Sequence, residues 1–301
     1  KPIPEMLDGE NVLRGDLNSC GTRTGRMASS NPNLQNQPNN HDFPIRQAFI
    51  PRPGYVFINY DYSQLELRVM AHMSKDEKFM EIFLNGRDPH GEVAAACGLT
   101  RKQAKVLNFG VLYGMGPNKY MRTFGVSKDR AIEMIESYHT VYAGFARWKT
   151  ATENFAKRNG YVKNLFGRKR VLSEVAKNPF MGIDKRLYFG ELRQAVNTII
   201  QGTGADIVKR ATLAMTKRFV EEHLDAHFLL QVHDEVLIEA RIDQMREIER
   251  VVIDCMENTT KLDVPLLADG KIILNWGEMK DDDILSYPDR FDYSLISSLC
   301  T

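Results

Sequence analysis

Apolar residues follow two different spacings along the chain, and each spacing predicts one kind of element. Runs of β-branched and aromatic residues at Tyr55–Tyr62 (YVFINYDY) and Phe228–Ala240 (FLLQVHDEVLIEA) are typical of strands. From about residue 75 to residue 219, apolar residues recur every three or four positions, which is typical of helices. Proline and glycine predict breaks in this helical stretch near Pro89, Gly98, Gly116, Gly144 and Gly160.

Strand-bearing segments at both ends therefore enclose a mainly helical block. A short helix from about Ser63 to His72 is expected after the first strand, and another from about Asp243 to Thr259 after the second. The run GKIILNW (270–276) predicts a last short strand, and residues 18–44, rich in Gly, Asn, Ser and Pro, predict a loop. We predict an α+β fold in which both ends form one antiparallel sheet and the large, mainly helical block is an insertion.

Three titratable residues, His233, Asp234 and Glu235, interrupt the second strand-forming run. Acidic residues are depleted in strands, and a buried carboxylate is costly unless something neutralises it. A polar hairpin turn is one explanation. The other is that Asp234 meets Asp61, near the end of the first strand, at the rim of a shared sheet. Two carboxylates there would need cations, and Mg²⁺ prefers hard oxygen ligands. Two Mg²⁺ ions roughly 3.5–4 Å apart promote in-line phosphoryl displacement.

The composition indicates a globular protein and excludes several classes. With 301 residues and 43% hydrophobic content, the chain can bury a substantial core. It contains no apolar run of about 18 residues, so we expect no membrane span, and its first residues lack a secretory signal. The 4 cysteines form no C-x-x-C pair, which argues against a zinc site and is consistent with a reducing compartment.

The net charge of +1 hides two basic clusters. Residues 101–130 contain several Lys and Arg residues but only one acid, Asp129, and residues 157–170 (KRNGYVKNLFGRKR) contain no acid. Basic clusters in a neutral chain predict that one face binds a polyanion. Solvated helix faces are the alternative for either cluster alone.

Within the first cluster, the segment RKQAKVLNFGVLYG (101–114) places Arg101, Lys105, Phe109 and Tyr113 four residues apart. On a helix each such step advances about 6 Å and turns the side chain by about 40°, so the four form one stripe of two cations followed by two rings. A nucleoside triphosphate has the same order of phosphates and base, and cations with stacking faces would bind it. An amphipathic helix with a solvated basic start is an equal alternative.

Three segments in order resemble motifs A, B and C of the family A DNA polymerases. They are DYSQLELR (61–68), RKQAKVLNFGVLYG and QVHDEV (231–236); TGRMASSNPNLQNQP (24–38) and RQAVNTIIQGTGAD (193–206) resemble further family segments. The resemblance spans about residues 22–276 and implies a right-hand polymerase fold. It implies palm segments at 1–74 and 201–280, a fingers insertion at 75–200, and an acidic tail at 281–301.

The resemblance also implies the role of each matching residue. Asp61, Asp234 and Lys105 would be catalytic; Asp61, Asp234 and the backbone carbonyl of Tyr62 would bind two Mg²⁺ ions, and Glu235 would be a secondary acid. The nucleotide would be bound by Arg101, Lys105, Phe109, Tyr113, His90, Gln64 and Glu66. Primer and template would be contacted by Arg26, Asn33, Gln35, Arg193, Asn197, Gln201 and His233. Family members synthesise DNA from deoxynucleoside triphosphates on a primer–template.

Two of these residues have competing explanations. Ser63–Glu66 (SQLE) fits a capping box at a helix start, whereas the family glutamate excludes ribonucleotides. His90, in DPHGEV, fits a helix-capping or satisfied histidine as well as a triphosphate contact.

Family thumbs grip the duplex backbone, and no thumb or exonuclease sequence is recognised. We therefore predict the catalytic piece of a split or truncated polymerase, with a second polypeptide or upstream region supplying the thumb. The expected location is cytoplasmic, in a bacterium or phage-infected host, with an organelle as an alternative. A single-subunit RNA polymerase and a non-catalytic nucleic-acid-binding subunit are the rival functions.

Overall fold

The computed structural model describes residues 3–38, 44–177, 184–273 and 275–278. The predicted acidic tail, 281–301, lies outside the described residues. Contacts divide the chain into two compact units. The sheet unit comprises residues 1–63, 205–261 and 266–301, and the helical unit comprises residues 64–204 and 262–265. The sequence-based boundaries, after residues 74 and 200, remain a prediction about domains.

The sheet unit is built on four antiparallel strands in the order β6-β7-β3-β8. Their bounds are β3 Tyr55–Tyr62, β6 Ala226–Val232, β7 Glu235–Arg241 and β8 Ala268–Ile273. β3 comes from the start of the chain, yet it pairs with β7 on one side and β8 on the other. The prediction that both ends of the chain form one antiparallel sheet is confirmed.

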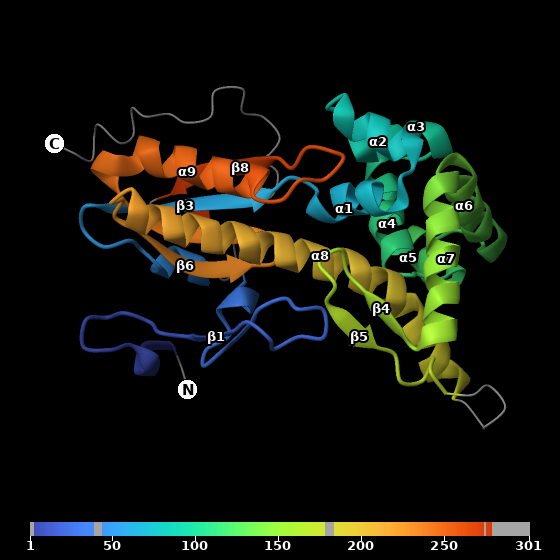
Figure 1. The fold of residues 1–301 in the computed structure, drawn as a ribbon, viewed down its shortest axis with the longest axis horizontal. Coiled ribbons are helices and arrows are strands. Elements are labelled where there is room, and N and C mark those ends of the chain that lie inside the picture. Colours follow the sequence, from blue (N-terminus) through green and yellow to red (C-terminus); the bar gives the residue numbers. More distant parts are fainter. Residues whose placement is uncertain (1–2, 39–43, 178–183, 274, 279–301) are drawn as a thin grey trace. The chain divides into compact units, whose positions relative to one another are not determined.

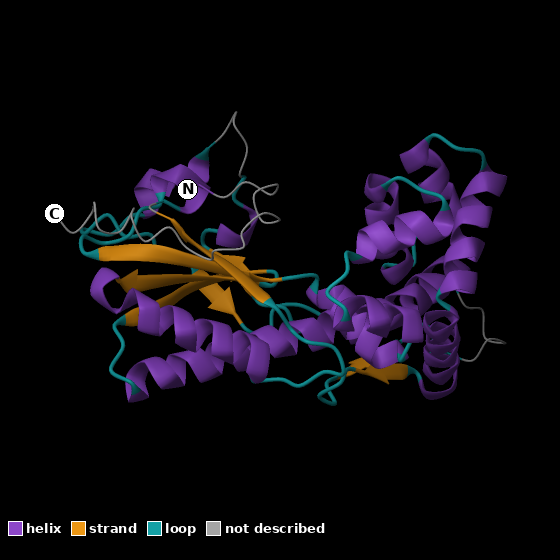
Figure 2. Ribbon diagram, turned by 90° about the horizontal axis from the view of Figure 1, so that it is seen from above, coloured by secondary structure: helices purple, strands orange, loops and turns teal. Residues whose placement is uncertain are grey.

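Both faces of this sheet are covered. On one face lie α9 (Met245–Asn258) and residues 205–221 of α8 (Lys185–Glu221), which run along the strands in Figures 1 and 2. Buried apolar residues of α9, among them Ile248, Val251 and Val252, form this layer. A second cluster, made by Phe57, Leu230, Val232, Leu237, Ile273 and Trp276, packs with Leu34 and Phe49 from the N-terminal segment. The N-terminal segment also contains two short strands and three 3-10 helices: β1 (Asp16–Asn18), β2 (Ala28–Ser30), η1 (Ile3–Met6), η2 (Leu34–Asn36) and η3 (Ile45–Ala48). Two further 3-10 helices, η4 (Ile242–Gln244) and η5 (Trp276–Glu278), belong to the C-terminal part of this unit.

The helical unit begins with α1 and continues through α7 before α8. The bounds are α1 Leu65–Ser74, α2 Glu77–Leu84, α3 Pro89–Cys97, α4 Arg101–Leu112, α5 Pro117–Phe124, α6 Lys128–Val141 and α7 Ala143–Asn159. Four of the predicted breaks coincide with helix ends. Pro89 begins α3, and Gly98 and Gly160 end α3 and α7 in the left-handed conformation that glycine adopts without strain. Gly116 precedes α5 as its N-cap.

The break predicted near Gly144 lies at Tyr142, between α6 and α7, and Gly144 is the second residue of α7. The absence of a side chain at Gly144 permits close packing. A Cβ atom at Gly144 would lie 2.7 Å from the Cα of Asp76. The buried Asp76 carboxylate accepts hydrogen bonds from the backbone N–H groups of Phe79 and Phe145, so it caps α2 and the start of α7 together.

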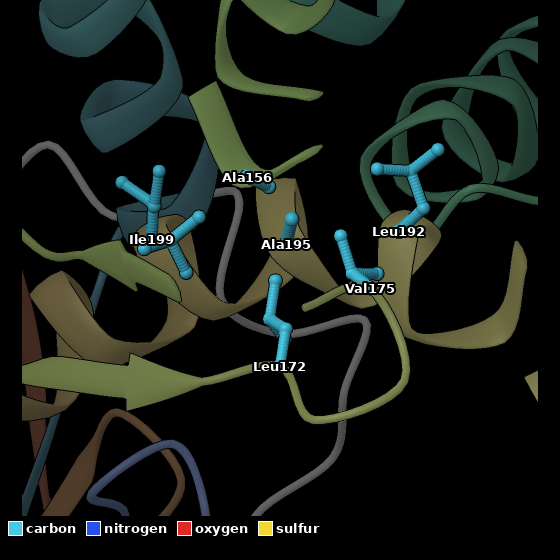
Figure 3. Packing of buried hydrophobic residues seen from close by; sticks show 7 residues of the cluster. Ala156, Leu172, Val175, Leu192, Ala195 and Ile199 are labelled. Atoms are coloured by element: carbon cyan, nitrogen blue, oxygen red, sulfur yellow. The ribbon is translucent and has the colours of Figure 1, made fainter. Parts of the chain in front are cut away.

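A hairpin that the helical periodicity missed follows α7. β4 (Tyr161–Lys163) and β5 (Lys169–Val171) pair antiparallel within the second basic cluster. Beneath them lies a core of Ala156, Val162, Leu172, Val175, Leu192, Ala195 and Ile199, shown in Figure 3. Three-residue strands are too short to carry a recognisable alternation, so only packing against α7 and α8 identifies them.

Within the described ranges, none of the helices combines the length and the apolar character that a bilayer crossing requires.

Candidate active site

The acidic end of the sheet is formed by a two-residue hairpin turn. Val232 pairs with Glu235, leaving His233 and Asp234 as the turn between β6 and β7. His233 has φ 56, the left-handed conformation that such tight turns require. β7 is the neighbour of β3, and its first residue, Glu235, is the cross-strand partner of Asp61. His233 and Asp234 therefore form a hairpin turn, as the first explanation predicts, and this turn lies at the same rim of the sheet as Asp61, as the second explanation predicts.

Four carboxylates gather at this end of the sheet. On the other side of β3, Asp61 is the cross-strand partner of Asp269 in β8. Burial raises the pKa of Asp61 well above its ordinary value, and the charge of Asp234 raises it further. The charges of Glu235 and Asp269 act in the same direction. The structure thus brings Asp61 and Asp234 close enough to interact electrostatically, although 172 positions separate them in the sequence (234 − 61 − 1).

Hydrogen bonds fix the backbone and one of the acids around this rim. The side chain of Asn59 donates to Glu235 Oε1 at 2.6 Å, and this hydrogen bond restricts the orientation of the glutamate side chain. The Gln231 side chain donates to the backbone carbonyl of His233 at 2.9 Å, and the Gln35 side chain donates to the carbonyl of Gln231 at 2.8 Å. The turn that carries Asp234 is therefore supported by side chains from two other segments.

The chemistry of the rim fits a divalent cation. Asp61 Oδ1 is buried and has no hydrogen-bond partner among the described residues. A buried carboxylate oxygen without a donor, beside three further carboxylates, carries an uncompensated cost that a cation would remove. The side chains of the described residues do not by themselves form a group of three or more His, Cys, Asp and Glu arranged around one ion. Backbone carbonyls and bound ligand oxygens would have to complete the coordination.

The second candidate feature, the stripe along α4, is confirmed as helix geometry in the helical unit. Thr100 caps α4 in a capping box with Gln103: the Gln103 N–H donates to Thr100 Oγ1 at 3.3 Å, and the Thr100 N–H donates to Gln103 Oε1 at 3.0 Å. Arg101, Lys105 and Phe109 lie on this helix, and Tyr113 is its C-cap. The rings of Phe109 and Tyr113 are stacked, with centroids 6.2 Å apart.

The two cations of the stripe differ in their surroundings. Arg101 Nε donates to Asp88 Oδ2 at 2.7 Å, and both side chains are partly exposed. That ion pair raises the pKa of Arg101. Burial opposes a lowered pKa at Asp88, but the bonds from Arg101 and from the His90 and Gly91 N–H groups lower it nonetheless. Lys105 is exposed, and no described residue forms an ion pair with it. Lys105 is therefore available to an anionic ligand, whereas Arg101 would exchange Asp88 for one.

Glu66 serves a different contact from the expected capping box. α1 begins at Leu65 with Gln64 as N-cap, in the left-handed conformation and without a side-chain capping bond. The helix therefore starts one position later than the Ser63–Glu66 capping box predicts, because the chain turns at Gln64. Glu66 is buried, and its Oε2 accepts a 2.6 Å hydrogen bond from the Tyr113 hydroxyl. This bond joins the motif A segment to the end of α4.

His90 is buried at the start of α3, facing the stripe. Its ring lies 5.8 Å from that of Phe109, measured between centroids. Its Nδ1 lies 2.9 Å from the side-chain nitrogen of Asn108, and Asp88 caps the helix through the His90 and Gly91 N–H groups. Burial lowers the pKa of His90 to about 4, so the ring is neutral at physiological pH. Asn108 is thus the partner of one ring nitrogen of His90, and the ring also lies beside Phe109 of the stripe.

The predicted primer–template residues are distributed over both units. In the sheet unit, Arg26 lies in the segment before β2, Asn33 caps η2, Gln35 bonds to β6, and His233 occupies the turn. In the helical unit, Arg193, Asn197 and Gln201 follow one another at four-residue spacing on α8 and so share one face. Arg193 packs against Gly114, where a Cβ atom would lie 2.9 Å from the Arg193 Cβ.

Three residues of these sites escaped sequence reasoning. Asp269 completes the acidic rim, Asp88 holds Arg101, and Asn108 contacts His90. Asp88 carried a signal, because an Asp before Pro at a helix start is a typical N-cap. Asp269 and Asn108 carried none, since the register of β8 and the burial of one face of α4 are not visible in local sequence.

Comparison with known proteins relates the whole described chain to one family. A family model described as DNA polymerase family A matches residues 1–278. DNA polymerase I of Caldicellulosiruptor bescii is 39% identical over 271 residues, which cover 86% of this chain and 31% of that protein. The thermostable DNA polymerase I of Thermus aquaticus is 36% identical over 293 residues, which cover 93% of this chain and 34% of that protein. The chain thus spans about a third of the length of these relatives.

A solved structure agrees with these relatives. The POL domain of Pol1 from M. smegmatis, in complex with DNA primer-template and dNTP, superimposes with a TM-score of 0.86 at 30% identity. The match covers 91% of this chain and 50% of that one.

Proposed function

The chain belongs to DNA polymerase family A, and we propose that it catalyses template-directed DNA synthesis, joining a deoxynucleotide to a primer 3′-hydroxyl. The observation that carries this proposal is the acidic rim of the sheet unit, where Asp61 has a buried oxygen without a donor beside Asp234, Glu235 and Asp269. An enzyme that transfers phosphoryl groups needs such a concentration of oxygen ligands, while a binding module does not.

Asp61 and Asp234 would hold Mg²⁺, assisted by the backbone carbonyl of Tyr62. When bound, two such ions supply charge neutralisation at the attacking and leaving oxygens. Glu235 is held by Asn59, so it would act as a secondary acid that tunes the field at the rim. The aspartates themselves position the reacting groups, because phosphoryl transfer depends mainly on positioning and electrostatic stabilisation.

The helical unit would bind the triphosphate and base. Lys105, exposed and without an ion pair to a described residue, would contact the phosphates first. Arg101 would follow by releasing Asp88, while Phe109 and Tyr113 would offer stacking faces to the sugar and base. The basic β4–β5 hairpin and Arg193 would contact the phosphate backbone of DNA.

Primer extension by the purified chain tests this function. We expect addition of the complementary deoxynucleotide only, with Mg²⁺ required, on a short primer–template at low salt. Low salt is needed because phosphate contacts weaken steeply as salt rises. Binding of primer–template without extension, in the presence of Mg²⁺ and all four dNTPs, would favour the non-catalytic rival. Extension only after addition of a second polypeptide would support the predicted need for a thumb.

Glu66→Ala should relax the choice of sugar. The carboxylate is buried and fixed by Tyr113, so it would occupy the space beside the 2′ position of an incoming nucleotide. We expect the ratio of ribonucleotide to deoxynucleotide incorporation to rise by at least about tenfold, the scale on which pocket shape discriminates between similar substrates.

The matched control is Glu77→Ala, which removes an exposed acid from the first turn of α2 in the same unit. Its ratio should equal that of the wild type. An unchanged ratio in Glu66→Ala would limit Glu66 to holding Tyr113. Preferred use of ribonucleotides by the wild type would instead identify an RNA polymerase.

A further inference from the structure

Asn108 is a buried polar residue on the α4 helix whose role the proposed function leaves open. It lies three positions after Lys105 and directly before Phe109, and its side chain is fully buried. A buried amide in a helix interior costs free energy unless it is hydrogen-bonded. Its side-chain nitrogen lies 2.9 Å from His90 Nδ1, while its Oδ1 has no partner among the described residues. The interaction with His90 is thus the contact that Asn108 provides.

The chemistry of this contact determines where the imidazole proton lies. A neutral imidazole carries one N–H donor and one acceptor nitrogen. With the Asn108 amide placed so that its nitrogen faces the ring, this nitrogen can only donate, and Nδ1 of His90 accepts the hydrogen bond. The proton of the ring then resides on Nε2. This follows the general pattern in which the partner of one ring nitrogen fixes the state of the other.

The surroundings keep the ring neutral and leave Nε2 for a ligand. The charged groups that face His90 are Asp88 at the start of its own helix and Arg101 and Lys105 on α4. The two cations and burial oppose protonation, and Asp88 alone favours it. No described residue hydrogen-bonds to Nε2, so this nitrogen can donate to a ligand.

We propose that Asn108 is a positioning residue that holds His90 as the neutral Nε2–H tautomer, so that Nε2–H donates to a phosphate oxygen of the nucleotide beside Arg101 and Lys105. The identity of the ligand rests on the proposed function, whereas the assignment of the tautomer is independent of it. The advantage of this arrangement is a fixed neutral donor. A histidine that titrated near neutral pH would change its charge beside the triphosphate, whereas this one binds in the same way across the physiological range.

The tautomer can be read directly in the full chain. We label the histidines with ¹⁵N, assign His90 from the spectrum of His90→Gln, and record nitrogen–proton correlations between pH 6 and pH 8. The expected result is an unprotonated Nδ1 and a protonated Nε2 throughout, with the Nε2 signal shifting when dATP is added. An Nδ1–H tautomer or an imidazolium in this range would overturn the proposal, even if the chain proved to be an active polymerase.

Two substitutions of Asn108 separate positioning from packing. Asn108→Leu keeps the volume but cannot donate; we expect KM for dNTP to rise about threefold to tenfold, the value of one hydrogen bond, with kcat less affected. Asn108→Asp places a carboxylate on Nδ1 and raises the pKa of His90. The ratio of its KM to that of the wild type should therefore fall as pH decreases from 8 to 6, because His90 gains a positive charge.

A residue that only filled space would give a ratio independent of pH, and that outcome would overturn the proposal. The control is Asn159→Leu, which removes the exposed amide that bonds to the Phe155 carbonyl at the end of α7. Its KM and its His90 spectrum should match those of the wild type. If the wild type failed to extend primers, the NMR spectra would still determine the state of His90, so failure of the two proposals can be distinguished.

Discussion

Replacing Asp61 or Asp234 with Asn should lower the rate of nucleotide addition by at least about 10²–10³-fold, the order of loss when one preorganised electrostatic group is removed. Each substitution keeps the size and shape of the side chain and removes the charge that would hold Mg²⁺. Single-turnover primer extension measures the rate independently of DNA release. The matched control is Asp243→Asn, which removes an exposed carboxylate paired with Arg241 in the same unit and should retain full activity.

Asp61→Asn should at the same time stabilise the fold at neutral pH. The folded protein raises the pKa of Asp61, so the protonated carboxyl is favoured in the folded state and the ionised one is disfavoured. Stability is therefore lost as pH rises from the ordinary pKa of Asp, about 3.9, through the raised value. Asn cannot ionise and escapes this loss. We expect a higher Tm at pH 7 without Mg²⁺, by roughly 2–4 °C per kcal/mol of relieved repulsion, and no difference below about pH 4.

For Asp61→Asn, the rate of nucleotide addition should fall while the Tm rises. A variant that merely unfolds would lose both rate and Tm, whereas the removal of a ligand carboxylate lowers the rate and raises the Tm. Added Mg²⁺ should raise the Tm of the wild type more than that of Asp61→Asn, because a ligand that binds only the folded state stabilises it. Equal Mg²⁺ effects on both proteins would contradict the assignment of Asp61 as a ligand.

Gly110→Ala should damage the helical unit through one buried contact. Tyr120 of α5 lies fully buried against α4, and its hydroxyl donates to the backbone carbonyl of Leu107 at 3.1 Å. A Cβ atom at Gly110 would overlap that hydroxyl oxygen and would lie 2.7 Å from the ring carbon that bears it. Overpacking of this kind costs about 1–3 kcal/mol. The displaced α4 carries Lys105 and Phe109, so we also expect weaker dNTP binding.

Thermal unfolding of two further variants decides whether the contact is the cause. Gly190→Ala is the matched control, because this glycine also lies in a helix but has open space where the Cβ would be. It should be neutral or slightly stabilising, by roughly 0.5–1 kcal/mol, as Ala is the better helix former. In Gly110→Ala/Tyr120→Leu the smaller side chain at 120 should restore much of the Tm lost in Gly110→Ala. A Gly110→Ala protein as stable as Gly190→Ala would disprove the close contact.

The structure also decides what the glycines of this segment do. From the sequence, Gly110 and Gly114 could permit either bending or close packing, and the structure shows close packing at both. Tyr120 occupies the space beside Gly110, and Arg193 lies against Gly114, which additionally adopts φ +65. Sequence alone could not distinguish these roles, because a glycine that permits bending and one that permits close approach are the same letter. The two roles are distinguished only by the residues that pack against the glycine, and Tyr120 lies 10 positions after Gly110 in the sequence (120 − 110).

Local sequence determined the features that depend on neighbouring residues. The run Tyr55–Tyr62 forms β3 with the predicted bounds, the α4 stripe follows from four-residue spacing, and the interruption at His233 and Asp234 is a turn. The tertiary structure alone decided which distant residues meet. It placed Asp269 beside Asp61, Asp88 on Arg101, Asn108 on His90 and Tyr120 on Gly110. Strand and helix periods are written in adjacent residues, whereas the register between strands and the packing of helices depend on the shape of the whole core.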